Sequence, residues 1–134
     1  MSSIYVERAR ALVGTRFRAQ GRDAETGLDC VGLALAVFGI PAISVRRDYA
    51  LRGSHKHELC QQVLRFFRRV SNIAARPGDL VISECASDQL HLSICVPSSF
   101  VHADARLRRV VETPGRPSWP CLGTYRRRAH GQGR

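Results

Sequence analysis

The nine residues Cys30–Phe38 are the strongest constraint on how this chain can fold. As a helix they would be apolar almost all round, and Gly39 and Pro41 end the run. A helix without a polar face belongs in the interior, so the rest of the chain has to enclose it. At 134 residues the chain is long enough to build that core without disulfide or metal support.

The remainder of the first half predicts two further helices. Residues 3–13 form the first, with Ser3 as its cap and Gly14 at its end. The apolar spacing of residues 54–70 predicts the other. Loop-like sequence at 15–29 and an irregular basic link at 46–53 separate the helices.

The second half changes to short β-rich runs separated by Pro, Gly, Ser and Asp, at 80–82, 90–96, 100–102, 107–111 and 122–126. Helices followed by strands predict an α+β domain, with N-terminal helices packed on a C-terminal antiparallel sheet. We expect residues 1–126 to form a single domain and residues 127–134 to be a basic, disordered tail.

The charge is unusual, since 21 Lys and Arg against 11 Asp and Glu give +10. Such a field attracts polyanions, which include nucleic acids and the carboxylates of peptidoglycan. An Arg-rich solvated surface is equally compatible with it. Because aromatic residues make up only 7% and no recognition helix or zinc finger is evident, a nucleic-acid partner is not expected.

The termini and cysteines bear on where the chain is made. Five irregularly spaced cysteines are not a disulfide framework. The N-terminus lacks a signal peptide, and no stretch has the length of a membrane span. We therefore expect synthesis in a reducing cytoplasm and no membrane association.

Cys30 is the first candidate for chemistry, because it lies where the buried helix begins. The partial positive charge and free N–H groups of a helix N-terminus stabilise a thiolate, so a lowered pKa is expected. The same N–H groups can hold an oxyanion. A buried structural cysteine is the alternative.

Two histidines strengthen the catalytic interpretation. His91 opens one predicted strand and His102 ends the next. If these strands are antiparallel neighbours, the two rings can meet. One ring would then take the proton of Cys30, and the other would hold the first in the required tautomer.

Four segments in order, spread over most of the chain, resemble the signature of the NlpC-type papain-like cell-wall peptidases. The family forms are a Gly-Thr-x-Tyr segment with Gly-Gly, then Gly-Phe-Asp-Cys-Ser-Gly-Leu, then Pro-Gly-Asp-Leu-Val, then His-Val-Gly-Ile-Tyr followed by Ile-His-Ala. Their counterparts are Gly14-Thr15-Arg16-Phe17 with Gly21, Gly27–Leu33, Arg76–Val81, and His91–Val96 with Val101-His102-Ala103.

The resemblance implies a papain-like NlpC-type fold with Cys30 as nucleophile, His91 as base and His102 as the residue that orients His91. It implies a cysteine endopeptidase that needs no cofactor or metal. Its substrate would be peptidoglycan stem peptides, cut at the γ-D-glutamyl to diamino-acid bond through a thioester.

The stretch Phe17–Asp23 and the bare domain without an export signal are most similar to the branch of this family found with phage tails and gene transfer agents. That similarity implies tail proteins as partners. It also implies a phage-like particle that carries the enzyme to the cell wall.

Departures from the family pattern bear on substrate recognition. Val31 replaces a serine that helps to bind the free amino end of the stem peptide, and Phe17 replaces a tyrosine hydroxyl. We hypothesise that the Gln20 amide replaces that hydroxyl as donor to the oxyanion, with loop bracing as the alternative. Asp29 is expected to cap the helix, and binding of a substrate amine is its alternative role.

Other functions are compatible with parts of the sequence. A thiol amidase or acyltransferase of the same fold would use identical catalytic residues, and a basic nucleic-acid-binding module would fit the charge. A zinc site would draw on Cys85, His91, Cys95 and His102, although their spacing matches no paired zinc pattern. Trp119, between two prolines, is expected to pack rather than to line a groove.

Overall fold

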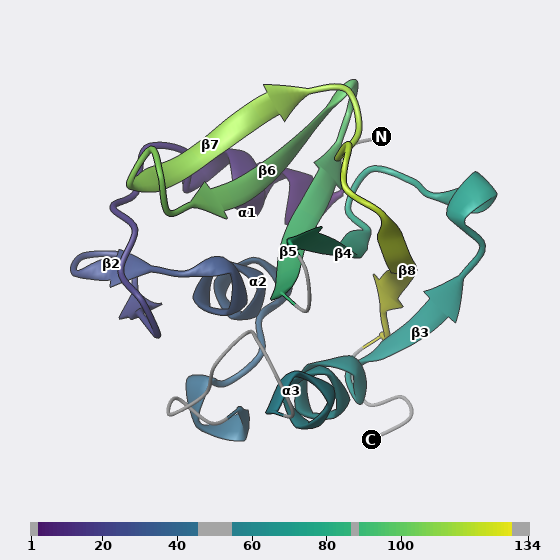
Figure 1. Cartoon of the computed structure of the whole chain (residues 1–134), viewed down its shortest axis with the longest axis horizontal. Helices are drawn as coiled ribbons and strands as arrows, with labels where there is room; N and C mark the ends of the chain where they lie inside the picture. The colour runs from purple at the N-terminus through teal and green to yellow at the C-terminus, as the bar shows by residue number, and fades with distance from the viewer. Residues whose placement is uncertain (1–2, 46–54, 87–88, 130–134) are drawn as a thin grey trace.

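The computed structural model describes residues 3–45, 55–86 and 89–129 and consists of helices packed against an antiparallel sheet (Figure 1). The elements in chain order are α1 (Ile4–Ala11), β1 (Arg22–Asp23), β2 (Gly27–Leu28), α2 (Cys30–Phe38), η1 (Ala42–Ser44), α3 (His55–Leu64), β3 (Phe67–Val70), η2 (Asn72–Ala74), β4 (Leu80–Ala86), β5 (Gln89–Val96), β6 (Ser99–Asp104), β7 (Arg109–Pro114) and β8 (Cys121–Arg127). This arrangement confirms the α+β prediction. None of the described helices is long and apolar enough to cross a membrane.

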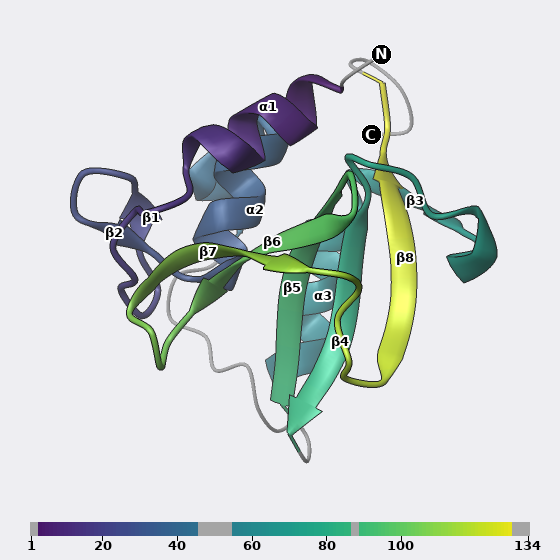
Figure 2. The same ribbon diagram turned by 90° about the horizontal axis from the view of Figure 1, so that it is seen from above.

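The central helix α2 has the predicted bounds and the predicted burial. Asp29 caps its N-terminus, and Gly39 ends it in the left-handed conformation at φ 67°. Every residue of α2 except Ala36 is buried. The helix packs against α1 on one side and against β5 and β6 on the other, so it lies in the core as its composition requires (Figure 2).

The first helix is also confirmed, with the predicted cap at its start, although it ends at Ala11, before the predicted stop at Gly14. The Ser3 hydroxyl accepts the N–H of Tyr5 at 3.0 Å, as an N-cap does. Val6 and Ala9 are the buried residues of α1. The loop predicted at 46–53 lies outside the described residues.

The predicted helix at 54–70 is wrong in its second part. Helix α3 ends at Leu64, and Phe67–Val70 form strand β3, which pairs with β8. Over only four residues, apolar spacing fits the period of a helix as well as that of a strand. Pairing with a strand that lies far along the chain decides the outcome, and the Phe67 ring then packs against Phe38 at 4.9 Å.

The six-stranded sheet has the order β3-β8-β4-β5-β6-β7, and all of its neighbouring strands are antiparallel. All five predicted strands exist, although the fourth begins at Arg109 rather than at 107. The last strand extends to Arg127, and the N–H of Arg128 donates to the carbonyl of Phe66 at 2.9 Å. The expected tail from residue 127 therefore overlaps this strand, and residues 130–134 lie outside the described part.

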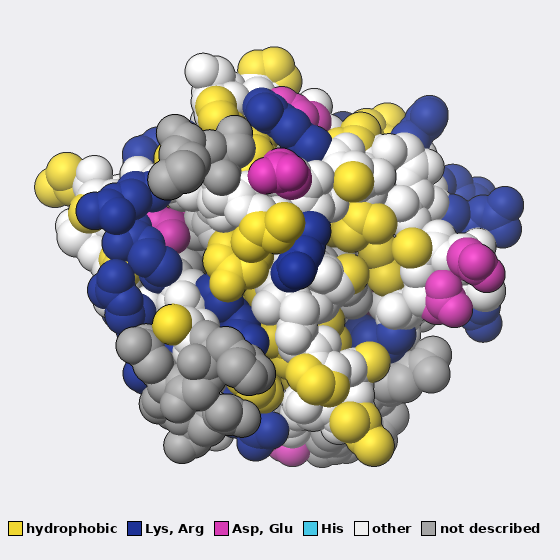
Figure 3. Space-filling view, turned by 180° about the vertical axis from the view of Figure 1, so that it is seen from behind, with side chains coloured by type: hydrophobic (Ala, Val, Ile, Leu, Met, Phe, Trp, Pro, Cys, Tyr) yellow, Lys and Arg dark blue, Asp and Glu magenta, His cyan; other side chains and the backbone are white. Residues whose placement is uncertain are grey.

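Arginine side chains are spread over the rear face of the molecule rather than gathered on one element (Figure 3). Apolar and acidic side chains lie between them. On that face, the described residues therefore do not concentrate the net charge of +10 in a single basic patch.

A short hairpin, β1–β2, replaces part of the predicted loop at 15–29 and brings that segment onto the start of α2. Leu28 pairs with Arg22 in the hairpin and forms a parallel bridge with Phe17. A Cβ added to Gly32 in α2 would overlap the carbonyl oxygen of Gly21. The glycine at position 32 is thus what allows the loop to lie against the first turn of the helix.

We expect Gly32→Ala to lower the free energy of unfolding by about 2–3 kcal/mol, because the added methyl group forces the loop away from α2. Urea denaturation measures this. Gly115→Ala is the matched control, since its Cβ would meet nothing within 4 Å and its φ of 83° alone is unfavourable. Equal losses in the two variants would contradict the packing argument.

Candidate active site

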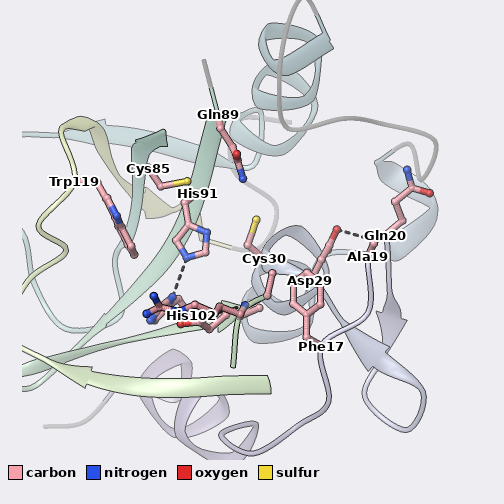
Figure 4. A pocket seen from close by; sticks show the side chains of 14 residues that line it. Phe17, Ala19, Gln20, Asp29, Cys30, Cys85, Gln89, His91, His102 and Trp119 are labelled. Atoms are coloured by element: carbon pink, nitrogen blue, oxygen red, sulfur yellow. Dashed lines mark hydrogen bonds between the residues drawn. The ribbon is translucent and has the colours of Figure 1, made fainter. Parts of the chain in front are cut away.

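Cys30 lies at the first position of α2 and at the wall of a cavity of about 480 Å³. The side chain is only 2% exposed. In Figure 4 its side chain lies beside the ring of His91 in the same cavity. The lining residues include all three predicted catalytic residues together with Phe17, Gln20, Asp29 and Trp119.

The two predicted histidines meet across the sheet. His91 Nε2 on β5 and His102 Nδ1 on β6 lie 2.9 Å apart, with the rings nearly perpendicular at 85°. The His91 ring lies between the sulfur of Cys30 and His102 in Figure 4. The contact between the two rings, expected from antiparallel neighbouring strands, is confirmed.

Aromatic rings enclose this imidazole pair. The Trp119 indole lies edge-on to His91 at 5.0 Å and to His102 at 5.8 Å between ring centroids. Phe100 lies 4.9 Å from His102. Trp119 therefore lines the cavity as well as packing against the two histidines. The sequence did not predict this, because nothing in the proline-rich segment around Trp119 indicates a contact with β5.

Asp29 fills the capping role. Its Oδ1 accepts the N–H of Gly32 at 2.8 Å and its Oδ2 accepts the N–H of Gln20 at 3.0 Å. The guanidinium of Arg22 lies 3.5 Å from Oδ1, with both side chains almost completely buried. The carboxylate is therefore engaged by the protein itself, as expected for a cap.

The remaining predicted binding residues have different positions. Val31 is fully buried in the core and does not line the cavity, whereas Phe17 does. Gln20 lines the cavity with its backbone at φ 58°, and in Figure 4 its amide points away from Cys30. That orientation gives no support to Gln20 as an oxyanion donor, so this role stays a prediction.

The expected lowering of the Cys30 pKa is wrong. The pKa of this thiol is raised to about 12, mainly by burial, with contributions from the negative charges of Asp29 and Cys85. Hydrogen bonds from the backbone of Leu92 and Val31 act in the opposite direction but are outweighed. The helix N-terminus thus competes with desolvation and with its own capping carboxylate.

Burial acts on the histidines in the complementary direction. The pKa of His91 is lowered to about 4, mainly by burial and then by the charge on His102, while Asp104 acts in the opposite direction. Burial also lowers the pKa of His102. At neutral pH the site therefore holds a thiol and two neutral imidazoles, a state in which His91 is able to accept a proton.

Cys85, considered from sequence only as a zinc ligand, also lines this cavity. It follows the buried part of β4, and in Figure 4 its side chain lies near those of His91 and Trp119. None of the five cysteines forms a disulfide. Cys95 lines a separate cavity of about 250 Å³, and no group of three or more potential metal ligands occurs among the described residues.

We expect the alkylation rate of Cys30 by iodoacetamide to rise steadily from about pH 7 to about pH 10, because the reactive thiolate fraction grows about tenfold per pH unit below the pKa. Mass spectrometry of the Cys30 peptide measures this, with the exposed Cys121 as internal reference. A plateau already reached near neutral pH would contradict a neutral thiol.

Acid should destabilise the fold through His91. The unfolded chain binds a proton on this residue near pH 6.5 and the folded chain only near pH 4, so the free energy of unfolding falls as pH is lowered through this window. His91→Gln should have a shallower slope in urea denaturation between these pH values. Identical slopes for the variant and the wild type would contradict this assignment.

Comparisons with known proteins bear on the fold. No protein-family model and no curated protein matches the sequence. Solved structures do match: the peptidoglycan hydrolase RipB from Mycobacterium tuberculosis (19% identity, TM-score 0.59), NlpC1 from Trichomonas vaginalis (17%, 0.66) and an NLP/P60-family protein, described as similar to lipoprotein, from Staphylococcus aureus (21%, 0.62).

Each comparison covers 92% of this chain but only 62%, 42% and 40% of the respective structures, so the chain spans less than two thirds of these proteins. At these identities the likeness establishes the fold. The chain has the α+β, papain-like fold of the NlpC/P60 structures, as the sequence predicted.

Proposed function

We propose that this chain is a cysteine endopeptidase that hydrolyses a peptide bond in peptidoglycan stem peptides. The observation that carries the proposal is the meeting of three groups in one cavity: a cysteine at the N-terminus of a buried helix, and two histidines joined at 2.9 Å. The shared fold with RipB, a peptidoglycan hydrolase, supports the choice of substrate.

In the proposed mechanism Cys30 attacks the scissile carbonyl while its proton passes to His91. The tetrahedral oxyanion lies at the N-terminus of α2, beside first-turn N–H groups other than that of Gly32, which the Asp29 carboxylate already accepts. The C–N bond then breaks, and His91 returns the proton to the leaving amine. Water hydrolyses the thioester, with His91 accepting and then returning a proton, and the thiol is regenerated.

The neutral resting state shapes this mechanism. Because burial favours a protonated Cys30 and an unprotonated His91, the proton moves during the attack rather than before it. Closing the cavity with substrate removes water from both groups, and the developing charges on sulfur and imidazole then stabilise each other.

The proposal includes a bond and a route to the wall. The bond is the γ-D-glutamyl to diamino-acid linkage that the resemblance implies. The route is a phage-like particle whose tail proteins carry the chain, and its only support is the similarity of Phe17–Asp23 to the phage-tail and gene-transfer-agent branch. An amidase or acyltransferase of this fold would use the same three residues, and product analysis separates it.

We expect wild-type protein to release stem-peptide fragments from purified peptidoglycan and Cys30→Ala to release none. Mass spectrometry of the fragments identifies the bond cut and the nucleophile in one experiment. Cys121→Ala, which removes an exposed cysteine outside the cavity lining, is the matched control and should keep full activity. Undiminished digestion by Cys30→Ala would end the proposal.

A further inference from the structure

We propose that Thr113 is a positioning residue that sets the tautomer of His102 and, through it, that of His91. The effect of Thr113 on catalysis rests on the proposed function, whereas its effect on the histidine tautomers does not. Thr113 belongs to β7, and neither its position nor its residue type is part of the four motifs. Its hydroxyl lies 3.2 Å from His102 Nε2, the ring nitrogen that faces away from His91.

The sheet register explains why these side chains meet. His102 pairs with Val111 across β6 and β7, and Thr113 follows Val111 by two residues. Side chains two residues apart lie on the same face of a sheet, so Thr113 is the diagonal neighbour of His102. The three side chains therefore form a continuous line from β5 through β6 to β7, with contacts of 2.9 Å and 3.2 Å.

Hydrogen-bond direction along this line has two possible states. If His102 carries its proton on Nε2, it donates to the Thr113 oxygen, and its bare Nδ1 accepts from His91 Nε2–H. His91 then has an unprotonated Nδ1 that can receive the Cys30 proton. If His102 carries the proton on Nδ1 instead, His91 must keep its own proton on Nδ1 and cannot act as base.

The Thr113 hydroxyl makes the active state possible because its oxygen can accept Nε2–H of His102; the same hydroxyl can donate to a bare Nε2 when the ring takes the other form. The ring is 4% exposed and is flanked by Phe100 and Trp119, so water has little access to replace that acceptor. A buried N–H without an acceptor is costly, which makes the hydroxyl a determinant of where the proton lies.

The test compares Thr113→Val, which keeps the shape and removes the hydroxyl, with Thr113→Ser, which restores it. We expect Thr113→Val to lower kcat about fivefold to tenfold with little change in KM, the effect of losing one ordinary hydrogen bond in the transition state. Thr113→Ser should recover most of the loss. Thr124→Val is the control, because its hydroxyl donates to Asn72 and contacts neither histidine.

A second readout does not depend on activity. Two-bond ¹H–¹⁵N spectra of ¹⁵N-histidine-labelled protein distinguish the two tautomers, and His102→Gln identifies the signals of this ring. We expect the Nε2–H form in the wild type, in Thr113→Ser and in Thr124→Val, and a mixture of forms in Thr113→Val.

The outcomes separate the two proposals. A wild-type His102 in the Nδ1–H form, or tautomers that Thr113→Val leaves unchanged, would overturn the role of Thr113 whatever the activity. If the tautomers change as expected but wild-type protein cuts no stem peptide, the positioning role stands and the peptidase assignment fails.

Discussion

The carboxylate of Asp29 is the interaction on which the site depends. With one oxygen it caps α2, and with the other it holds the backbone of Gln20 in the segment that covers the helix N-terminus. Arg22 from the hairpin approaches the same group. A buried carboxylate is stable only when such partners surround it, so helix, loop and hairpin are fixed together. The position of Cys30, one residue later, follows from that arrangement.

The same carboxylate shows how structural and chemical demands oppose each other here. The cap that fixes Cys30 also places a negative charge beside its sulfur and works against the thiolate. Burial acts in the same direction on Cys30 and disfavours a charged His91. The enclosed imidazole pair is therefore suited to accept a proton that is released only when an electrophile binds, rather than to maintain an ion pair at rest.

Much of the fold could be predicted where local sequence decides it. The bounds of α2 followed from Asp29, Gly39 and the apolar run between them, and the histidine contact followed from two successive strands. Residues 67–70 could not be assigned correctly, because their partner β8 lies more than fifty residues away and only tertiary pairing distinguishes strand from helix there. The prediction of a lowered pKa for Cys30 was wrong for a similar reason. The helix end is a local feature of the sequence, whereas desolvation of the sulfur comes from the whole core.

The position of β8 has a consequence for how the molecule is completed during synthesis. Cys121–Arg127 lies between β3 and β4, which are joined to each other in the sheet only through it. A nascent polypeptide that has not yet released this segment from the ribosome leaves one edge of the sheet detached. Cys30, although translated early in helix α2, therefore faces a complete sheet only after β8 has left the ribosome, more than eighty residues later.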